Sequence, residues 1–214
     1  MSYNIKGLNN KILFPGFFEY VKSFHIFILI ETHVTEDKFE QFNKYFQGFE
    51  IFWKPAIKVR DRGRARGGCL YGVNKSLIKQ NIKYTFKSEN SIDSIHLFCN
   101  EFSANIFPMY LRGAAWHEEI AQVKEYFLQK QIENPIAIGD MNIRIGEYQP
   151  LIENVYREIF VSGLKRRSSK DREINSKGRD FIKFCEDYEM IILNGLDGTT
   201  TKFLNVEINL EWKL

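Results

Sequence analysis

The chain has few of the residues that build disulfide frameworks or structural zinc sites. Only three of its 214 residues are cysteines, and no CxxC pair occurs among them (Cys69, Cys99 and Cys185). An odd number of widely separated cysteines suggests neither a disulfide framework nor a structural zinc site, and predicts reduced, buried thiols. No HExxH sequence occurs either, which argues against a common kind of catalytic zinc site.

Long apolar runs and a strong charge bias are also absent. The longest apolar run, Ile26 to Ile30, is far too short to cross a bilayer. The polar opening, Ser2 to Lys6, is unlike a secretory signal, so we expect an intracellular protein, nuclear or cytoplasmic, without membrane contact. The net charge of +3 comes from 30 Lys and Arg against 27 Asp and Glu, which neither requires nor excludes a polyanionic partner.

No linker, repeat or low-complexity tract interrupts the sequence, which predicts a single domain over residues 1–214. A hydrophobic content of 44% is enough to bury a full core. Strands are predicted for short runs rich in Ile, Phe and Val: Ile26 to Glu31, Phe49 to Trp53, Cys69 to Val73, Ile95 to Cys99, Ile136 to Asp140 and Met190 to Asn194.

Apolar residues at helical spacing predict two clear helices, from about Glu118 to Lys130 and from about Ser176 to Tyr188. Strands outnumber helices, and several strands follow one another directly. This order favours an α+β or layered sandwich over an alternating parallel sheet.

The sharpest local motif is Pro135-Ile-Ala-Ile-Gly-Asp140-Met-Asn142, an apolar strand that ends on a glycine, a carboxylate and an amide. Asp140 can orient or deprotonate a water molecule, and Asn142 can donate its amide to a phosphate oxygen. The same residue types also build ordinary turns. Taken alone, the motif leaves both interpretations open.

A second apolar strand, Ile26 to Ile30, ends in Glu31-Thr-His33. A glutamate in this position can be an oxygen ligand for Mg²⁺, and an exposed edge carboxylate is the alternative. If the strand continues, His33 lies on the same face as Glu31. A zinc site made of these two residues is only weakly supported, because no further Cys or His set accompanies them. At the start of the chain, Asn4 lies in a short predicted strand. Asparagine is unfavourable in strands, so we expect its side chain to form a hydrogen bond there.

Together these motifs resemble the endonuclease/exonuclease/phosphatase superfamily, which includes the apurinic endonucleases and DNase-I-like enzymes. The matching segments are Tyr-Asn4-Ile-Lys-Gly-Leu, Ile-Glu31-Thr-His, Gly67-Gly-Cys-Leu-Tyr-Gly-Val, Phe-Pro-Met-Tyr110 and Gly-Asp140-Met-Asn142, in the family's order. The stretch from Lys170 to Gly178 and Ile192-Leu-Asn194-Gly195 resemble the endonucleases of non-LTR retrotransposons in particular.

The resemblance implies a four-layered α/β/β/α sandwich of two mixed sheets. It also implies a DNA-cutting phosphodiesterase that uses Mg²⁺ or Mn²⁺. Glu31 would bind the metal, with Asn4 assisting it or fixing the attacking water. Tyr110 would contact the scissile phosphate, Asp140 would position or activate the nucleophile, and Asn142 would stabilise the transition state.

Two basic loops predict contacts with DNA phosphates. The first, Lys58 to Arg66, places five cations in nine residues and includes Arg60, Arg62, Arg64 and Arg66. The second is Lys165-Arg166-Arg167. Such clusters bind phosphates without reading sequence, although either one can instead be a solvated face or a mobile loop. DNA is the expected partner, and no obligate protein partner is predicted.

The sequence departs from the family after Asn194. Members of the family close with a Ser-x-x-Asp strand and a Ser-Asp-His motif that supplies a general base, and neither is present here. The alternating tail, Leu204 to Trp212, is predicted to form a strand that stands in for part of the missing one, with Asn209 in place of the first Asp. We therefore expect a C-terminally incomplete domain, lacking its last strands, with impaired activity.

This pattern is typical of a truncated or decayed mobile-element fragment. The alternatives are a module that binds nucleic acid without cutting it and a phosphatase acting on phosphoinositides or phospholipids.

Overall fold

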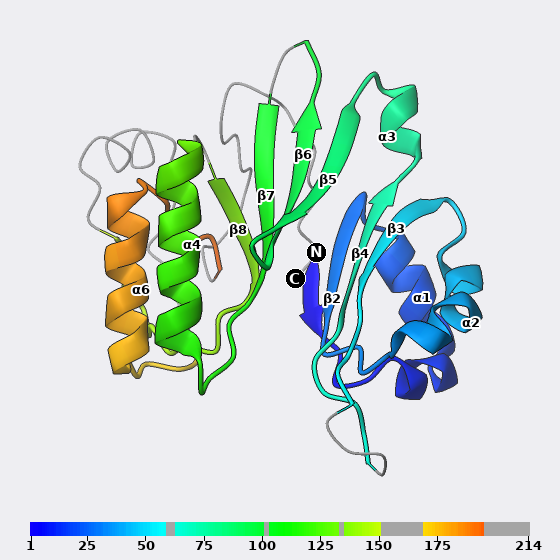
Figure 1. Cartoon of the computed structure of the whole chain (residues 1–214), viewed down its shortest axis with the longest axis horizontal. Helices are drawn as coiled ribbons and strands as arrows, with labels where there is room; N and C mark the ends of the chain where they lie inside the picture. Colours follow the sequence, from blue (N-terminus) through cyan, green and yellow to red (C-terminus); the bar gives the residue numbers. More distant parts are fainter. Residues whose placement is uncertain (59–62, 101–102, 133–134, 151–168, 195–214) are drawn as a thin grey trace. The chain divides into compact units, whose positions relative to one another are not determined.

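The computed structural model describes residues 1–58, 63–100, 103–132, 135–150 and 169–194 (Figure 1). The chain divides into two compact units. The first is made of Met1–Tyr110 with Ala137–Asp140, and the second of Leu111–Ile136 with Met141–Leu214. A single domain over residues 1–214 stays a prediction.

One sheet of the first unit has the strand order β1-β2-β4-β3. The strands are β1 (Ser2–Asn4), β2 (Ile26–Ile30), β3 (Phe49–Lys54) and β4 (Cys69–Asn74). β1 runs parallel to β2, with Asn4 opposite Ile30, while β4 is antiparallel to both β2 and β3. The sheet is therefore mixed, and the strands predicted at Ile26, Phe49 and Cys69 are confirmed.

The other sheet has the order β5-β6-β7-β8, with β5 (Lys83–Glu89), β6 (Ile92–Phe98), β7 (Ser103–Tyr110) and β8 (Pro135–Asp140). β5, β6 and β7 are antiparallel neighbours. Gly139, next to last in β8, approaches Met109, next to last in β7, so these two strands end at the same edge. The strand predicted at Ile95 begins three residues earlier, at Ile92, and β5 and β7 were not predicted.

The apolar side chains of β2 alternate between two hydrophobic cores. Phe27 and Leu29 belong to a core formed with α1 (Pro15–Lys22) and α2 (Phe39–Asn43). Ile28 and Ile30 belong to a second core, which includes Ile95 and other residues of the opposite sheet. Successive side chains of a strand point to opposite faces, so one strand serves two cores.

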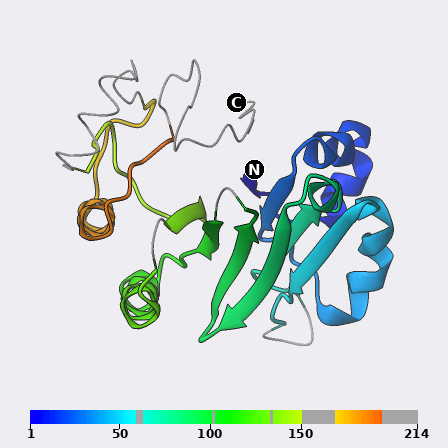
Figure 2. The same cartoon turned by 90° about the horizontal axis from the view of Figure 1, so that it is seen from above.

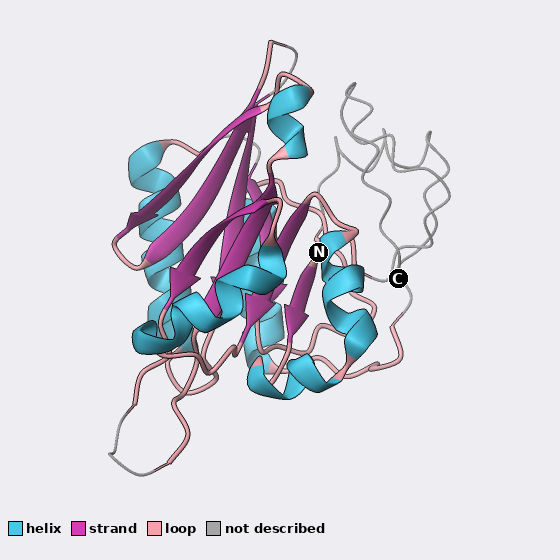
Figure 3. Ribbon diagram, turned by 90° about the vertical axis from the view of Figure 1, so that its right-hand side faces the viewer, coloured by secondary structure: helices cyan, strands magenta, loops and turns pink. Residues whose placement is uncertain are grey.

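The first unit is thus layered as helices, sheet and sheet (Figures 2 and 3). Short helical turns complete it: η1 (Asn9–Leu13), η2 (Glu36–Lys38), η3 (Lys44–Phe46) and α3 (Ser76–Lys79). The predicted α+β sandwich of two mixed sheets with helices is confirmed.

The second unit contains the two predicted helices, α4 (Trp116–Lys130) and α6 (Ser176–Asp187). They pack through Phe127 and Phe184, whose ring centroids are 5.8 Å apart. Asn175 caps α6, since its Oδ1 accepts a hydrogen bond from the Gly178 amide at 2.7 Å. None of the described helices is long and apolar enough to cross a bilayer.

The strand predicted from Met190 to Asn194 is wrong. Residues 190–193 have no regular secondary structure, and Asn194 lies in a turn. The side chain of Gln149 takes the place of a strand partner: its Nε2 donates to the Ile192 carbonyl at 2.6 Å, and its Oε1 accepts from the Ile192 amide at 3.1 Å. The Gln149 side chain therefore forms both backbone hydrogen bonds of Ile192 that a neighbouring strand would otherwise form.

The three thiols differ in burial. Burial raises the pKa of Cys69 to about 11 and that of Cys185 to about 12, whereas Cys99 is only half-buried. Because the thiolate is the reactive form, an aromatic disulfide reagent should modify Cys99 rapidly in the native protein and the other two only slowly. Counting the released chromophore before and after denaturation checks this, and rapid modification of more than one thiol would contradict the burial described.

Candidate functional site

Four of the residues predicted to act in catalysis or metal binding come from the ends of four strands. Asn4 is the last residue of β1, and Glu31 follows β2 directly. Since β1 and β2 are parallel, these two residues emerge side by side. Tyr110 ends β7 and Asp140 ends β8, the two strands whose ends share an edge of the other sheet.

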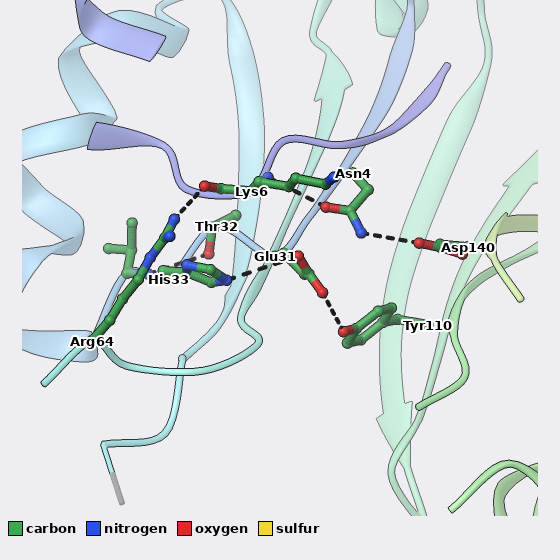
Figure 4. Close-up of polar contacts among 9 residues, drawn as sticks. Asn4, Lys6, Glu31, Thr32, His33, Arg64, Tyr110 and Asp140 are labelled. Atoms are coloured by element: carbon green, nitrogen blue, oxygen red, sulfur yellow. Dashed lines mark hydrogen bonds and ion pairs between the residues drawn. The ribbon is translucent and has the colours of Figure 1, made fainter. Parts of the chain in front are cut away.

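Two hydrogen bonds join these residues in pairs across the sheets (Figure 4). The Asn4 Nδ2 donates to Asp140 Oδ2 at 2.9 Å, and the Tyr110 hydroxyl donates to Glu31 Oε1 at 2.6 Å. Each pair takes one residue from each sheet. The structure therefore brings together Asn4, Glu31, Tyr110 and Asp140, which are far apart in the sequence.

The turn after β2 orients Glu31. Glu31 and His33 have φ angles of 56° and 57°, so the strand does not continue and the condition for a shared strand face is not met. The backbone amides of Thr32 and His33 instead donate to the carbonyls of Gly68 and Gly67, at 3.0 and 2.9 Å. A Cβ on Gly68 would lie 2.7 Å from the Thr32 hydroxyl, so this close approach requires glycine.

His33 nevertheless lies beside Glu31, with 4.0 Å between its Nε2 and the Glu31 Oε2. Its Nδ1 is buried, with no hydrogen-bond partner among the described residues. Burial lowers the pKa of His33, the charge of Arg64 lowers it further, and Glu31 opposes both. The imidazole is therefore neutral at physiological pH and adds no positive charge to the site.

Tyr110 acts as a hydrogen-bond donor. Burial raises its pKa well above the usual value, and the hydrogen bond to Glu31 and the charge of Glu31 raise it further. The phenol therefore keeps its proton through the physiological range. It can donate to a carboxylate or a phosphate oxygen, but it does not serve as a base.

The donor atoms at this site suit a hard divalent cation. The Glu31 and Asp140 carboxylates and the Asn4 amide oxygen are oxygen donors, and the Glu31 side chain is 26% exposed. Mg²⁺ and Mn²⁺ take such ligands and keep several waters. Among the described residues, no group of three or more His, Cys, Asp or Glu is placed to hold a metal ion by itself.

Asn142 belongs to the second unit. It has a φ of 50°, and its Nδ2 donates to the Leu111 carbonyl at 2.9 Å. One residue earlier, the Met141 carbonyl accepts from the Trp116 indole at 2.9 Å. The segment after β8 is thus fixed by its own unit, and the role predicted for Asn142 stays a prediction.

Only part of the basic loops falls on described residues. The connection between β3 and β4 projects beyond the strands (Figure 1), and the backbones of Ile57 and Arg66 pair in it at 3.0 and 2.9 Å. The Arg64 guanidinium donates to the Lys6 carbonyl, two residues beyond Asn4. The remaining predicted DNA-binding residues lie outside the described residues; they are Arg60, Arg62, Lys165, Arg166 and Arg167. The tail from Leu204 to Trp212 also lies outside them.

Two features that form the site were not predicted. The first is the hydrogen bond from the Arg64 guanidinium to the Lys6 carbonyl, which no sequence pattern predicts. The second is the packing role of Gly139, where an added Cβ would lie 1.8 Å from the Met109 carbonyl oxygen. The signal for it was present in the glycine directly before Asp140, which we interpreted only as part of a turn.

Comparison with known proteins gives structural matches only. No family model and no curated protein sequence matches the chain. The endonuclease domain of TRAS1, a telomere-specific non-LTR retrotransposon, is similar with a TM-score of 0.52 and 13% identity, over 90% of this chain and 73% of that one.

Two further solved structures match with lower scores. AP endonuclease LMAP from Leishmania major has a TM-score of 0.48 and 14% identity, over 67% of this chain. The 3′ phosphatase NExo from Neisseria, bound to a product DNA hairpin, has a TM-score of 0.43 and 13% identity, over 73%. The chain spans 55% and 62% of the length of these two structures. Its two-sheet sandwich has a DNase-I-like fold, similar to that of the TRAS1 endonuclease domain.

Proposed function

We propose that the chain is a metal-dependent endonuclease domain that hydrolyses DNA phosphodiester bonds. The supporting observation is the pairing of Asn4 with Asp140 and of Tyr110 with Glu31, from four strand ends of two sheets. Phosphodiester attack requires a neutralised phosphate, a positioned water and a stabilised leaving oxygen. Carboxylates, an amide and a protonated phenol in one place can meet these needs.

Glu31 and Asn4 would hold the Mg²⁺ or Mn²⁺ ion. When bound, the ion supplies positive charge for the phosphate oxygens and lowers the pKa of a bound water. Asn4 has a second task, since its Nδ2 already donates to Asp140 and fixes the orientation of that carboxylate. Asp140 would then position the attacking water and accept its proton.

Tyr110 would change partners when substrate binds. Its hydroxyl has one hydrogen, which is now donated to Glu31. Once Glu31 is engaged as a ligand, its oxygens are less available as acceptors, and the hydroxyl can donate to the scissile phosphate. Asn142 would donate its amide to the charge that develops on the phosphoryl oxygens.

The basic residues would hold the DNA backbone. Lys58, Arg64 and Arg66 would extend the site along the described part of the β3–β4 connection, and Arg64 ties that connection to the Lys6 carbonyl, two residues beyond Asn4. Cations that contact phosphates bind DNA without sequence preference and lose affinity as salt rises.

A module that binds nucleic acid without cutting it is the second candidate. The observation in its favour is that neither of the two hydrogen bonds that join the four site residues involves a histidine, the most common general base. Lack of a dedicated general base typically lowers a rate by about 10²- to 10⁴-fold. The basic residues serve either function equally well.

Nicking of supercoiled plasmid tests the proposal. We expect relaxed circles to accumulate with Mg²⁺, and nicking to disappear both with EDTA and in Glu31→Ala. Glu40→Gln, a change to an exposed carboxylate on α2, should nick like the wild type. No nicking with plasmid still retarded on the gel would favour the binding module. Phosphate release from a phosphoinositide without nicking would favour a phosphatase of the same fold.

A further inference from the structure

A cluster of aromatic rings around one lysine lies beside the strand that carries Asn4. This aromatic platform consists of Tyr3 of β1, Lys11 of η1, and Phe14 and Phe17 at the start of α1. Two of the rings face solvent: Tyr3 is 48% exposed and Phe14 is 59% exposed. Most other phenylalanines of the first unit fill its cores, so this exposure is unusual for the unit.

The backbone holds the lysine among the rings. The amide of Phe14 donates to the Lys11 carbonyl at 3.0 Å, which closes the turn between η1 and α1. The Lys11 ammonium then lies 5.6 Å from the Tyr3 ring centroid, 5.7 Å from that of Phe14 and 5.8 Å from that of Phe17. All three distances are within the range of cation–π attraction.

The charge of the platform limits what can bind to it. Among the described residues no carboxylate pairs with Lys11, so the cation has only aromatic faces as neighbours of complementary charge. A purely apolar partner would bury this cation at a cost in desolvation. A ligand with both a flat π-system and a negative charge satisfies the rings and the ammonium together, and a nucleotide has both.

The position of the platform agrees with such a ligand. β1 is the outermost strand of its sheet among the described strands. Tyr3 directly precedes Asn4 and points to the opposite face of the strand, as successive residues do. A chain of nucleotides held at Asn4 can therefore pass the edge of β1 and place a neighbouring base over Tyr3 and Phe14.

We propose that the aromatic platform stacks an unpaired base of the DNA strand that is held at the site, with Lys11 contacting the adjoining phosphate. The inference rests on the proposed function and specifies its substrate as DNA with a single-stranded or locally opened segment. Base-on-ring stacking with a nearby cation is a sequence-tolerant way to hold single strands.

Fluorescence anisotropy with a labelled oligothymidylate tests the platform. A strand of identical length and charge that carries abasic sites instead of bases is the matched ligand. Phe14→Ala and Phe14→Leu should each weaken oligothymidylate binding by roughly 5- to 150-fold and leave abasic-strand binding unchanged. Phe14→Trp should keep the affinity, because it keeps an aromatic face.

Leu13→Ala is the control, since Leu13 is 79% exposed next to the platform and has no ring. It should bind both strands like the wild type, and thermal unfolding should confirm that every variant folds. Full affinity in Phe14→Leu, or equal losses on both strands, would overturn the stacking proposal. If the wild type does not nick DNA with Mg²⁺ but the Phe14 variants still bind oligothymidylate more weakly, the proposed function is overturned and the stacking proposal is retained.

Discussion

Asp140→Asn should lower the rate of Mg²⁺-dependent nicking by roughly 10²- to 10⁴-fold. The amide has nearly the size of the carboxylate and can still accept the hydrogen bond that Asn4 donates at 2.9 Å. The change removes the negative charge and the proton-accepting oxygen but not the shape of the site. Single-turnover nicking rates over a range of DNA concentrations would separate the loss of rate from any loss of binding.

The control for this variant must be a carboxylate outside the site. Glu40→Gln changes an exposed acid on α2, whose Phe42 packs on the face of the first sheet away from the second sheet. It should retain the wild-type rate. A wild-type rate in Asp140→Asn would show that another group accepts the proton, and the role proposed for Asp140 would be wrong.

Asp93→Ala should lower the free energy of unfolding by about 1–3 kcal/mol, because it leaves a buried donor unsatisfied. Asp93 is only 4% exposed, and it accepts hydrogen bonds from the Tyr71 hydroxyl at 2.8 Å, from Lys54 Nζ at 3.0 Å and from the Ser88 hydroxyl at 2.7 Å. These donors come from both sheets, so one carboxylate joins the sheets through their second core. Its removal leaves the buried Tyr71 hydroxyl without this acceptor.

Denaturation in urea measures this loss, and Glu50→Ala is the matched control. Glu50 also accepts a hydrogen bond across the sheets, from the Tyr84 hydroxyl at 2.8 Å, but it is exposed. We expect an effect of about 0–1 kcal/mol there, because water replaces the lost partner. Equal effects of the two substitutions would mean that burial does not determine the contribution of these contacts.

The sequence predicts the strands best where apolar runs are continuous. The predicted strands at Ile26, Phe49 and Cys69 start where the structure has them, since β-branched and aromatic runs leave few other conformations. β5 was missed because only two apolar residues, Tyr84 and Phe86, alternate with the polar residues of this strand. Met190 to Asn194 was mistaken for a strand because the periodicity cannot show that a distant glutamine side chain pairs with its backbone.

The identities of the site residues were predictable, but their pairing was not. Strand-end motifs identified Asn4, Glu31, Tyr110 and Asp140, and the structure brings them together. The sequence does not show that Tyr110 bonds Glu31 rather than Asp140, because that depends on the register between two sheets. The neutral His33 beside Glu31 likewise results from a backbone turn at positive φ, which no spacing rule predicts.

The distance along the chain between Asn4 and Asp140 has a consequence for synthesis on the ribosome. The two hydrogen-bonded residues are 136 positions apart, whereas the described strands of the sheet that contains β1 end at Asn74. At a translation speed of about 5–20 residues per second, roughly 7–27 s pass between the making of Asn4 and of Asp140. A nascent chain can therefore form the described strands of its first sheet early, while the amide of Asn4 still lacks Asp140 as its acceptor and the proposed active site stays incomplete.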